Sequence, residues 1–79
     1  MENRVKKVKE IIKANIGNGC CGIYDCRDIM GDPKRTLYED EDITVDICDY
    51  YSYFEVLGLD HNEFKQVKEY YDSIVKKYR

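Results

Sequence analysis

Apolar residues near the start of the chain recur at the spacing of an α-helix. Four of them share one face of such a helix: Val5, Val8, Ile11 and Ile12. The remaining surface carries Arg4, Lys6, Lys7, Lys9 and Lys13, so the pattern predicts an amphipathic helix over about residues 2–15. Gly17 is expected to end this helix, because glycine commonly occupies the position just after a helix.

The C-terminal quarter of the chain shows a second helical pattern. Asp60 and Glu63 match a capping box, in which an acceptor at the helix start is followed three residues later by a glutamate. The apolar stripe that follows comprises Phe64, Val67, Tyr71, Ile74, Val75 and Tyr78. Together these features predict an amphipathic helix near residues 61–77.

Strand-like alternation occupies the middle of the chain. Over residues 43–49, apolar Ile43, Val45 and Ile47 alternate with Thr44, Asp46 and Cys48. This is the period of a half-buried strand. Residues 35–40 and 51–57 indicate two more strands, and the short acidic connector between the first two favours a hairpin. Residues 18–35 contain the only proline and three of the five glycines, so we expect a loop, with a short strand near residues 22–25 as an alternative.

The order of elements predicts one small α+β domain over residues 1–79. Two amphipathic helices would cover one face of a three-stranded antiparallel sheet, giving a two-layer sandwich. The expected core comprises Ile43, Val45, Ile47, Phe54, Val56, Phe64, Val67, Tyr71 and Ile74. The other face of the sheet would be open to water and would carry Thr44, Asp46, Cys48 and some of the tyrosines.

Acidic residues are concentrated in one part of the chain. The whole chain has a net charge of -3, but residues 36–60 alone carry -8 and contain no lysine or arginine. Four of the eight tyrosines lie in this segment. Carboxylates beside tyrosines suit a surface that binds a basic protein, because tyrosine supplies rigid contact area. A merely solvated hairpin tip is the alternative interpretation.

Composition narrows the class of protein. At 43% hydrophobic and 37% charged, with the apolar residues in periodic sets, the chain is expected to fold rather than to be disordered. The longest apolar run is too short for a bilayer span, and the N-terminus lacks the apolar core of a signal peptide. These observations favour a cytoplasmic protein.

The four cysteines are Cys20, Cys21, Cys26 and Cys48. They lack the paired Cys-x2-Cys spacing of structural zinc sites, and in the cytoplasm they are expected to be thiols. One alternative function for the protein is a metal- or redox-responsive module that uses these thiols. The only histidine, His61, follows a predicted helix start, and neither serine lies in a Gly-x-Ser-x-Gly elbow. We therefore expect a protein that is not an enzyme and needs no metal or cofactor.

One stretch of the chain supports a resemblance. Residues 25–59 contain a Cys-Arg-x-Ile-x-Gly-Asp segment, an acidic hairpin and the sequence Tyr-Phe-Glu-Val-Leu-Gly-Leu. This stretch resembles small acidic accessory proteins carried by phages and mobile elements of Gram-positive bacteria. The resemblance implies an anti-CRISPR-type inhibitor, which blocks an RNA-guided nuclease by occupying its DNA-binding groove.

The expected function is therefore a non-catalytic inhibitor that binds a basic protein partner, such as an RNA-guided nuclease. We expect no direct contact with nucleic acid or membrane. The predicted contact residues are Glu39, Asp40, Glu41, Asp42, Asp46, Asp49, Tyr50, Tyr51 and Tyr53. Another alternative function is that of a small regulatory or structural domain that forms homodimers through a sheet edge or the tyrosine face.

Overall fold

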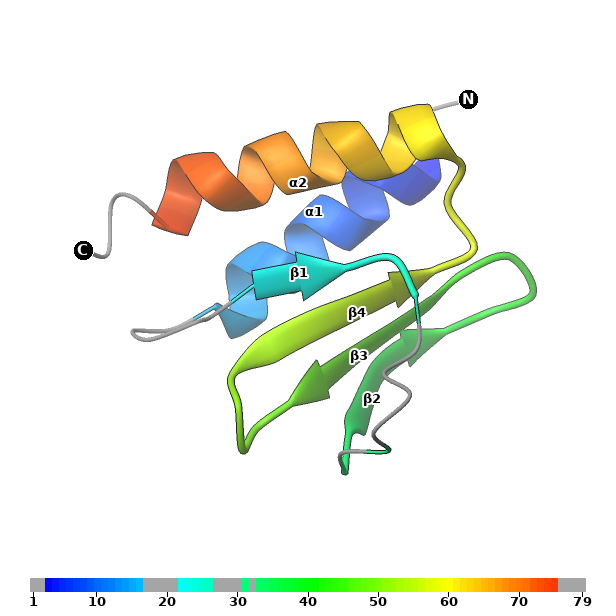
Figure 1. Cartoon of the computed structure of the whole chain (residues 1–79). Coiled ribbons are helices and arrows are strands. Elements are labelled where there is room, and N and C mark those ends of the chain that lie inside the picture. The colour runs from blue at the N-terminus through cyan, green and yellow to red at the C-terminus, as the bar shows by residue number, and fades with distance from the viewer. Residues whose placement is uncertain (1–2, 17–21, 27–30, 32, 76–79) are drawn as a thin grey trace.

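The chain folds into two layers, with two helices on one face of a sheet (Figure 1). This is seen in a computed structural model, which describes residues 3–16, 22–26, 31 and 33–75. The elements are α1 (Asn3–Asn15), β1 (Gly22–Tyr24), β2 (Arg35–Glu39), β3 (Thr44–Cys48), β4 (Tyr53–Leu57) and α2 (His61–Val75). The α+β class, both helices and the hairpin of β2 and β3 are confirmed.

The sheet itself differs from the prediction. It has four strands in the order β1-β4-β3-β2, and β1 pairs parallel to β4, so the three-stranded antiparallel sheet was wrong. A short strand near residue 22, which was the alternative to a loop, does form as the fourth strand. It has three residues, and Gly22 pairs with Tyr53, far away in the sequence. A short strand with a distant partner leaves no local periodicity by which to predict its pairing.

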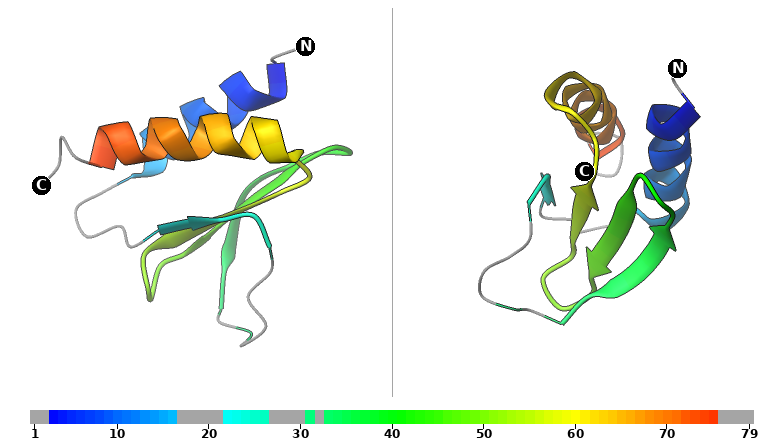
Figure 2. Two further views of the ribbon diagram at one scale, coloured as in Figure 1. Left: turned by 45° about the horizontal axis from the view of Figure 1, so that its top comes forward. Right: turned by 90° about the vertical axis from the view of Figure 1, so that its right-hand side faces the viewer.

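The core lies between the helices and one face of the sheet (Figure 2). Seven of the nine predicted core residues are buried: Ile43, Val45, Ile47, Phe54, Val56, Val67 and Tyr71. Phe64 and Ile74 are partly buried against them, and Tyr78 lies outside the described residues. The rings of Phe54 and Tyr71 meet edge to face, 6.1 Å apart, which ties α2 to the centre of the sheet.

The capping box at the start of α2 is confirmed. The Glu63 backbone N–H donates to Asp60 Oδ1 at 2.8 Å, and the Asp60 backbone N–H donates to Glu63 Oε1 at 3.0 Å. Arg4 of α1 also donates to both carboxylate oxygens of Glu63, at 2.6 Å each. The two helices are therefore joined at the point where α2 begins.

The sheet face opposite the helices is buried over most of β3 and β4, so the expectation of an open face was wrong for Asp46 and Cys48, while Thr44 is half-buried. Asp46 and Cys48 of β3 are 6% and 0% exposed, and Tyr53 and Glu55 of β4 are 8% and 1% exposed. Lys34, just before β2, brings its ammonium to 3.4 Å from Glu55, and the ring of Tyr24 meets Tyr53 edge to face. The alternation assigned Asp46 to the correct face, but it could not predict these contacts from distant residues.

Candidate protein-docking surface

Acidic side chains gather where β2 turns into β3. Glu39, Asp40, Glu41 and Asp42 are all exposed at this turn, at one end of the sheet (Figure 1). Gly58 packs against the backbone of Asp42, which brings the connection between β4 and α2 beside the turn. Asp60, also exposed, lies on that connection. We call the group formed by residues 39–42 and Asp60 the acidic tip.

Asp40 organises the acidic tip from within. Its Oδ1 accepts hydrogen bonds from the backbone N–H groups of Asp42 at 2.7 Å and Ile43 at 2.9 Å. Its Oδ2 accepts a hydrogen bond from the Tyr38 hydroxyl at 2.6 Å. The hydrogen bond from Tyr38, followed by those from the backbone, holds the pKa of Asp40 below its ordinary value. Asp40 therefore fixes the turn, and the neighbouring carboxylates project from it.

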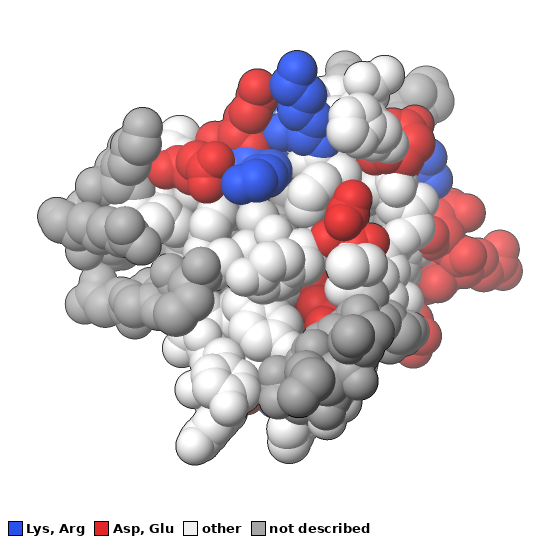
Figure 3. Space-filling view, in the orientation of Figure 1, with Lys and Arg blue, Asp and Glu red and all other residues white. Residues whose placement is uncertain are grey.

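Two basic side chains lie close to the acidic tip. Arg4 is held by Glu63, and the hydrogen bond between them raises the pKa of Arg4 and lowers that of Glu63. Glu63 also accepts a hydrogen bond from the backbone N–H of Asp60, so Arg4 lies beside the tip. Lys7 lies over the Tyr38 ring, 5.1 Å from its centre. Figure 3 shows acidic side chains along the right-hand edge of the molecule, where the turn lies in Figure 1.

Exposed tyrosines lie at the other end of β3, where the chain turns toward β4. Tyr50 is 79% exposed and Tyr51 is 51% exposed, and their rings meet edge to face at 4.7 Å. The Ser52 backbone N–H donates to the Cys48 carbonyl at 2.7 Å, with Ser52 in the left-handed region at a φ of 59°. We call residues 49–52 the tyrosine turn. Its hydrogen bonds hold two aromatic rings toward solvent.

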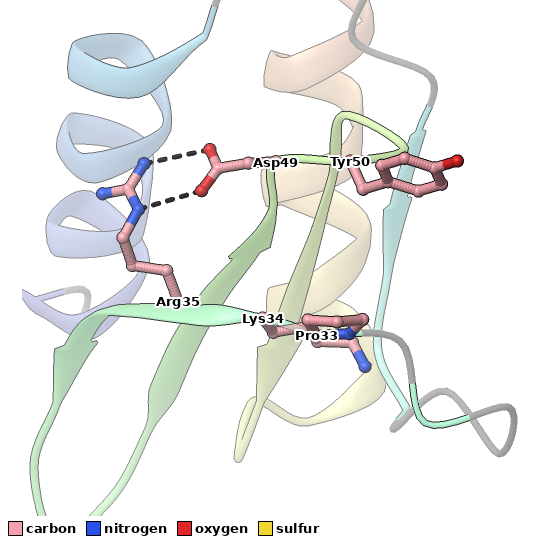
Figure 4. Close-up of a pocket in the computed structure, with 5 residues that line it drawn as sticks. All are labelled: Pro33, Lys34, Arg35, Asp49 and Tyr50. Atoms are coloured by element: carbon pink, nitrogen blue, oxygen red, sulfur yellow. Dashed lines mark hydrogen bonds and ion pairs between the residues drawn. The ribbon is translucent and has the colours of Figure 1, made fainter.

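Asp49 begins the tyrosine turn and is paired with Arg35. Arg35 Nε donates to Asp49 Oδ2 at 3.0 Å, and Arg35 Nη2 donates to Oδ1 at 3.1 Å. These hydrogen bonds hold the pKa of Asp49 below its ordinary value. Beside the pair is an open pocket of about 520 Å³, lined by Pro33, Lys34, Arg35, Asp49 and Tyr50 (Figure 4). The sequence offered no signal for this pocket.

The predicted contact set is thus divided between two places. Residues 39–42 lie at one end of β3, and Asp49, Tyr50 and Tyr51 lie at the other. The seven residue steps from Asp42 to Asp49 span about 23 Å of extended chain. Asp46 and Tyr53 are buried, so neither forms part of the exposed surface. Asp60 and Arg4 were not predicted to join the acidic group. The capping box indicated a fixed position for Asp60, but only the tertiary fold brings Arg4 to it.

Thiols and metal ligands give no second site in the described part of the chain. Cys26 is exposed and Cys48 is buried, both as free thiols, while Cys20 and Cys21 lie outside the described residues. The Cys48 sulfur accepts a hydrogen bond from the Tyr51 backbone N–H at 3.5 Å, so it serves the tyrosine turn. Over the described ranges, no three histidine, cysteine, aspartate or glutamate side chains converge to hold a metal ion.

Two further observations bear on the class of protein. Neither α1 nor α2, the helices of the described segments, combines the length and apolar character that crossing a bilayer requires. Comparison of the chain with protein-family models, with curated proteins and with solved structures found no match.

Proposed function

We propose that this protein is a non-catalytic binding module whose acidic tip docks on a basic surface of a partner protein. The observation that carries the proposal is the grouping of Glu39, Glu41, Asp42 and Asp60, all exposed, around a turn that Asp40 holds in place. Because the backbone of the turn is already held by Asp40, less conformational freedom is lost when its carboxylates bind lysine and arginine, so more of the attraction appears as affinity.

In its most concrete form, the proposal is an inhibitor of the anti-CRISPR type that acts in the cytoplasm. The acidic tip would occupy the basic groove in which an RNA-guided nuclease holds nucleic acid, and would compete with the phosphate backbone. The resemblance of residues 25–59 to accessory proteins of phages and mobile elements supports this form. The local charge supports it too, because the five carboxylates of the acidic tip outnumber the two cations, Arg4 and Lys7, that the described contacts place beside it.

Charge reversal at the tip tests the proposal. A Glu41→Lys, Asp42→Lys variant should lose inhibition of target-DNA cleavage by the nuclease, because two attractions become repulsions. A Glu10→Lys, Glu69→Lys variant is the matched control, with the same change in net charge at exposed helix positions outside the tip. Equal inhibition by both variants, with unchanged circular dichroism, would refute the proposal.

Salt dependence gives a second readout of the same surface. The association rate of the wild type with the nuclease should fall steeply between 0.1 and 1 M salt, because the Debye length shrinks from about 10 Å to about 3 Å. The tip variant should show a shallower dependence, while the helix variant should follow the wild type. Homodimerisation, the alternative, predicts instead a concentration-dependent sedimentation coefficient in the absence of any partner.

A further inference from the structure

The outer edge of the sheet connects the acidic tip with the tyrosine turn. β2 is the last strand of the order β1-β4-β3-β2, so within the described part of the chain no strand lies beyond it. It begins beside the tyrosine turn, where Arg35 pairs with Asp49, and ends in the acidic tip at Glu39. The first two residues of β2, Arg35 and Thr36, are exposed. One continuous edge therefore has carboxylates at one end and Tyr50 beside a pocket at the other.

We infer that this edge is a single two-point docking surface, and that the pocket beside Tyr50 receives an uncharged, apolar side chain of the same basic partner. The inference rests on the proposed function of the acidic tip and adds a second contact beyond the far end of β3, about 23 Å from Asp42. The partner is therefore expected to present a cluster of cations and, at that distance from the cluster, a protruding apolar side chain.

The charges that line the pocket explain why its occupant is apolar. Arg35 is paired with Asp49 through two hydrogen bonds, and Lys34 has its ammonium 3.4 Å from Glu55. A charged occupant would have to compete with these internal pairs. The ring of Tyr50 and the ring of Pro33 offer flat apolar surface instead (Figure 4). Exposed tyrosines of this kind are enriched among residues that dominate binding energy.

The tyrosine turn is already organised for such a contact. Tyr51 supports the Tyr50 ring edge to face, and the backbone hydrogen bonds to Cys48 fix the turn. A ring that is held in place loses less entropy on binding than a free one. The distance also fits one partner, because a standard interface of about 800 Å² per side is roughly 28 Å across and spans both ends of β2.

Tyr24 provides a matched control. It is 50% exposed, but it lies on β1, at the opposite edge of the sheet from β2. A side chain seated in the pocket contacts Tyr50 but not Tyr24, which is not among the residues that line the pocket. Loss of binding on replacement of Tyr24 would indicate a surface of a different shape, or general adhesion through exposed tyrosines.

Synthetic peptides that carry the expected chemistry of the partner test the inference. One peptide pair carries three arginines and, about seven residues away, either phenylalanine or alanine, because about seven extended residues span roughly 23 Å. A second pair has the reverse order, since the direction of the occupant along β2 is not specified. Binding of labelled peptides to the full chain at low salt is measured by fluorescence anisotropy, and amide chemical shifts identify the contacted residues.

We expect the phenylalanine peptide of at least one pair to bind about fivefold or more tighter than its alanine partner, as for an anchor side chain in a pocket. Tyr50→Ala should abolish this preference, whereas Tyr50→Phe and Tyr24→Ala should retain it, each with an unfolding curve that shows a folded chain. Equal binding of both peptides would overturn the two-point surface and leave the acidic tip as the docking site. If no peptide binds, the proposed function of the tip fails as well.

Discussion

Asp46 of β3 and Glu55 of β4 are direct cross-strand neighbours, and both carboxylates are buried. Glu55 has the ammonium of Lys34 at 3.4 Å. Asp46 Oδ1 finds no hydrogen-bond partner in the described part of the chain. Two neighbouring carboxylates with one nearby lysine form an unusual pair for the inside of so small a domain, because burial of an uncompensated charge is costly.

The first prediction concerns the unequal roles of these two carboxylates. Asp46→Val should raise the free energy of unfolding by about 1–2 kcal/mol, because valine suits a strand and removes a buried carboxylate oxygen that lacks a hydrogen bond. Glu55→Val should lower it by about 1–3 kcal/mol, because it leaves the ammonium of Lys34 without that partner. Urea denaturation measures both. Equal destabilisation by the two substitutions would show that Asp46 also has a stabilising partner.

The same residues show how far sequence reasoning reaches. The period of two assigned Asp46 and Cys48 to the face opposite Val45, which is correct, because side-chain direction in a strand is a local property. Whether that face is buried depends on Tyr24 and Lys34, which come from distant parts of the chain. Exposure of Asp46 was therefore predicted wrongly although its face was predicted correctly.

The candidate surface likewise combines features that can be predicted from the local sequence with features that depend on the tertiary fold. Glu41 and Asp42 were expected at the centre of a short hairpin connector and are found there, both exposed, because turn position and charge can be recognised locally. The separation of Tyr50 and Tyr51 from that turn also follows from strand length, yet a charge count along the chain treats them as one segment. The addition of Asp60, the proximity of Arg4 and the pocket beside Pro33 all require the tertiary fold.

The second prediction concerns the ion pair of Arg4 and Glu63. Glu63 has its pKa lowered from the ordinary 4.5 in the folded protein, chiefly by the hydrogen bond from Arg4. A lowered folded-state pKa contributes stability that is present above the unfolded value of 4.5 and is lost as the pH falls through the folded value. Arg4→Gln should therefore destabilise the protein near neutral pH, and its difference from the wild type should shrink in acid.

Thermal unfolding from about pH 7 to about pH 3 measures this difference, because that range covers the titration of a carboxylate with a lowered pKa. Lys68→Gln is the control, because Lys68 and Asp72 form an exposed pair at 3.6 Å within α2. Exposed pairs within one helix contribute little, so this variant should follow the wild type closely. A difference between Arg4→Gln and wild type that is constant across the pH range would show that Arg4 acts through packing rather than through its charge.

The third prediction separates Asp40 from its neighbours in the acidic tip. Asp40→Ala removes the acceptor for the backbone N–H groups of Asp42 and Ile43. These two amides should exchange with solvent faster, as measured by hydrogen exchange, because an unbonded N–H loses protection. Asp42→Ala removes an equal charge and should leave the exchange rate of the Ile43 amide unchanged. Identical exchange in the two variants would assign Asp40 no organising role.

The last prediction concerns the contact that brings Asp60 to the acidic tip. Gly58 has a φ of 99°, and a Cβ there would collide with the Asp42 carbonyl oxygen. Gly31 has a φ of 74°, but a Cβ there would meet no atom within 4 Å. Gly31→Ala should therefore cost only the backbone penalty of about 1–2 kcal/mol.

Gly58→Ala adds the collision to that penalty, so its total cost should exceed that of Gly31→Ala by at least about 1 kcal/mol. Because Asp42 must move to relieve the collision, chemical shifts should change at both Asp42 and Asp60, and the acidic tip should widen. The comparison isolates close packing from backbone conformation, since both glycines have positive φ values. An equal loss of unfolding free energy in the two variants would show that the connection between β4 and α2 does not pack closely against the turn. Asp60 would then no longer belong to the acidic tip.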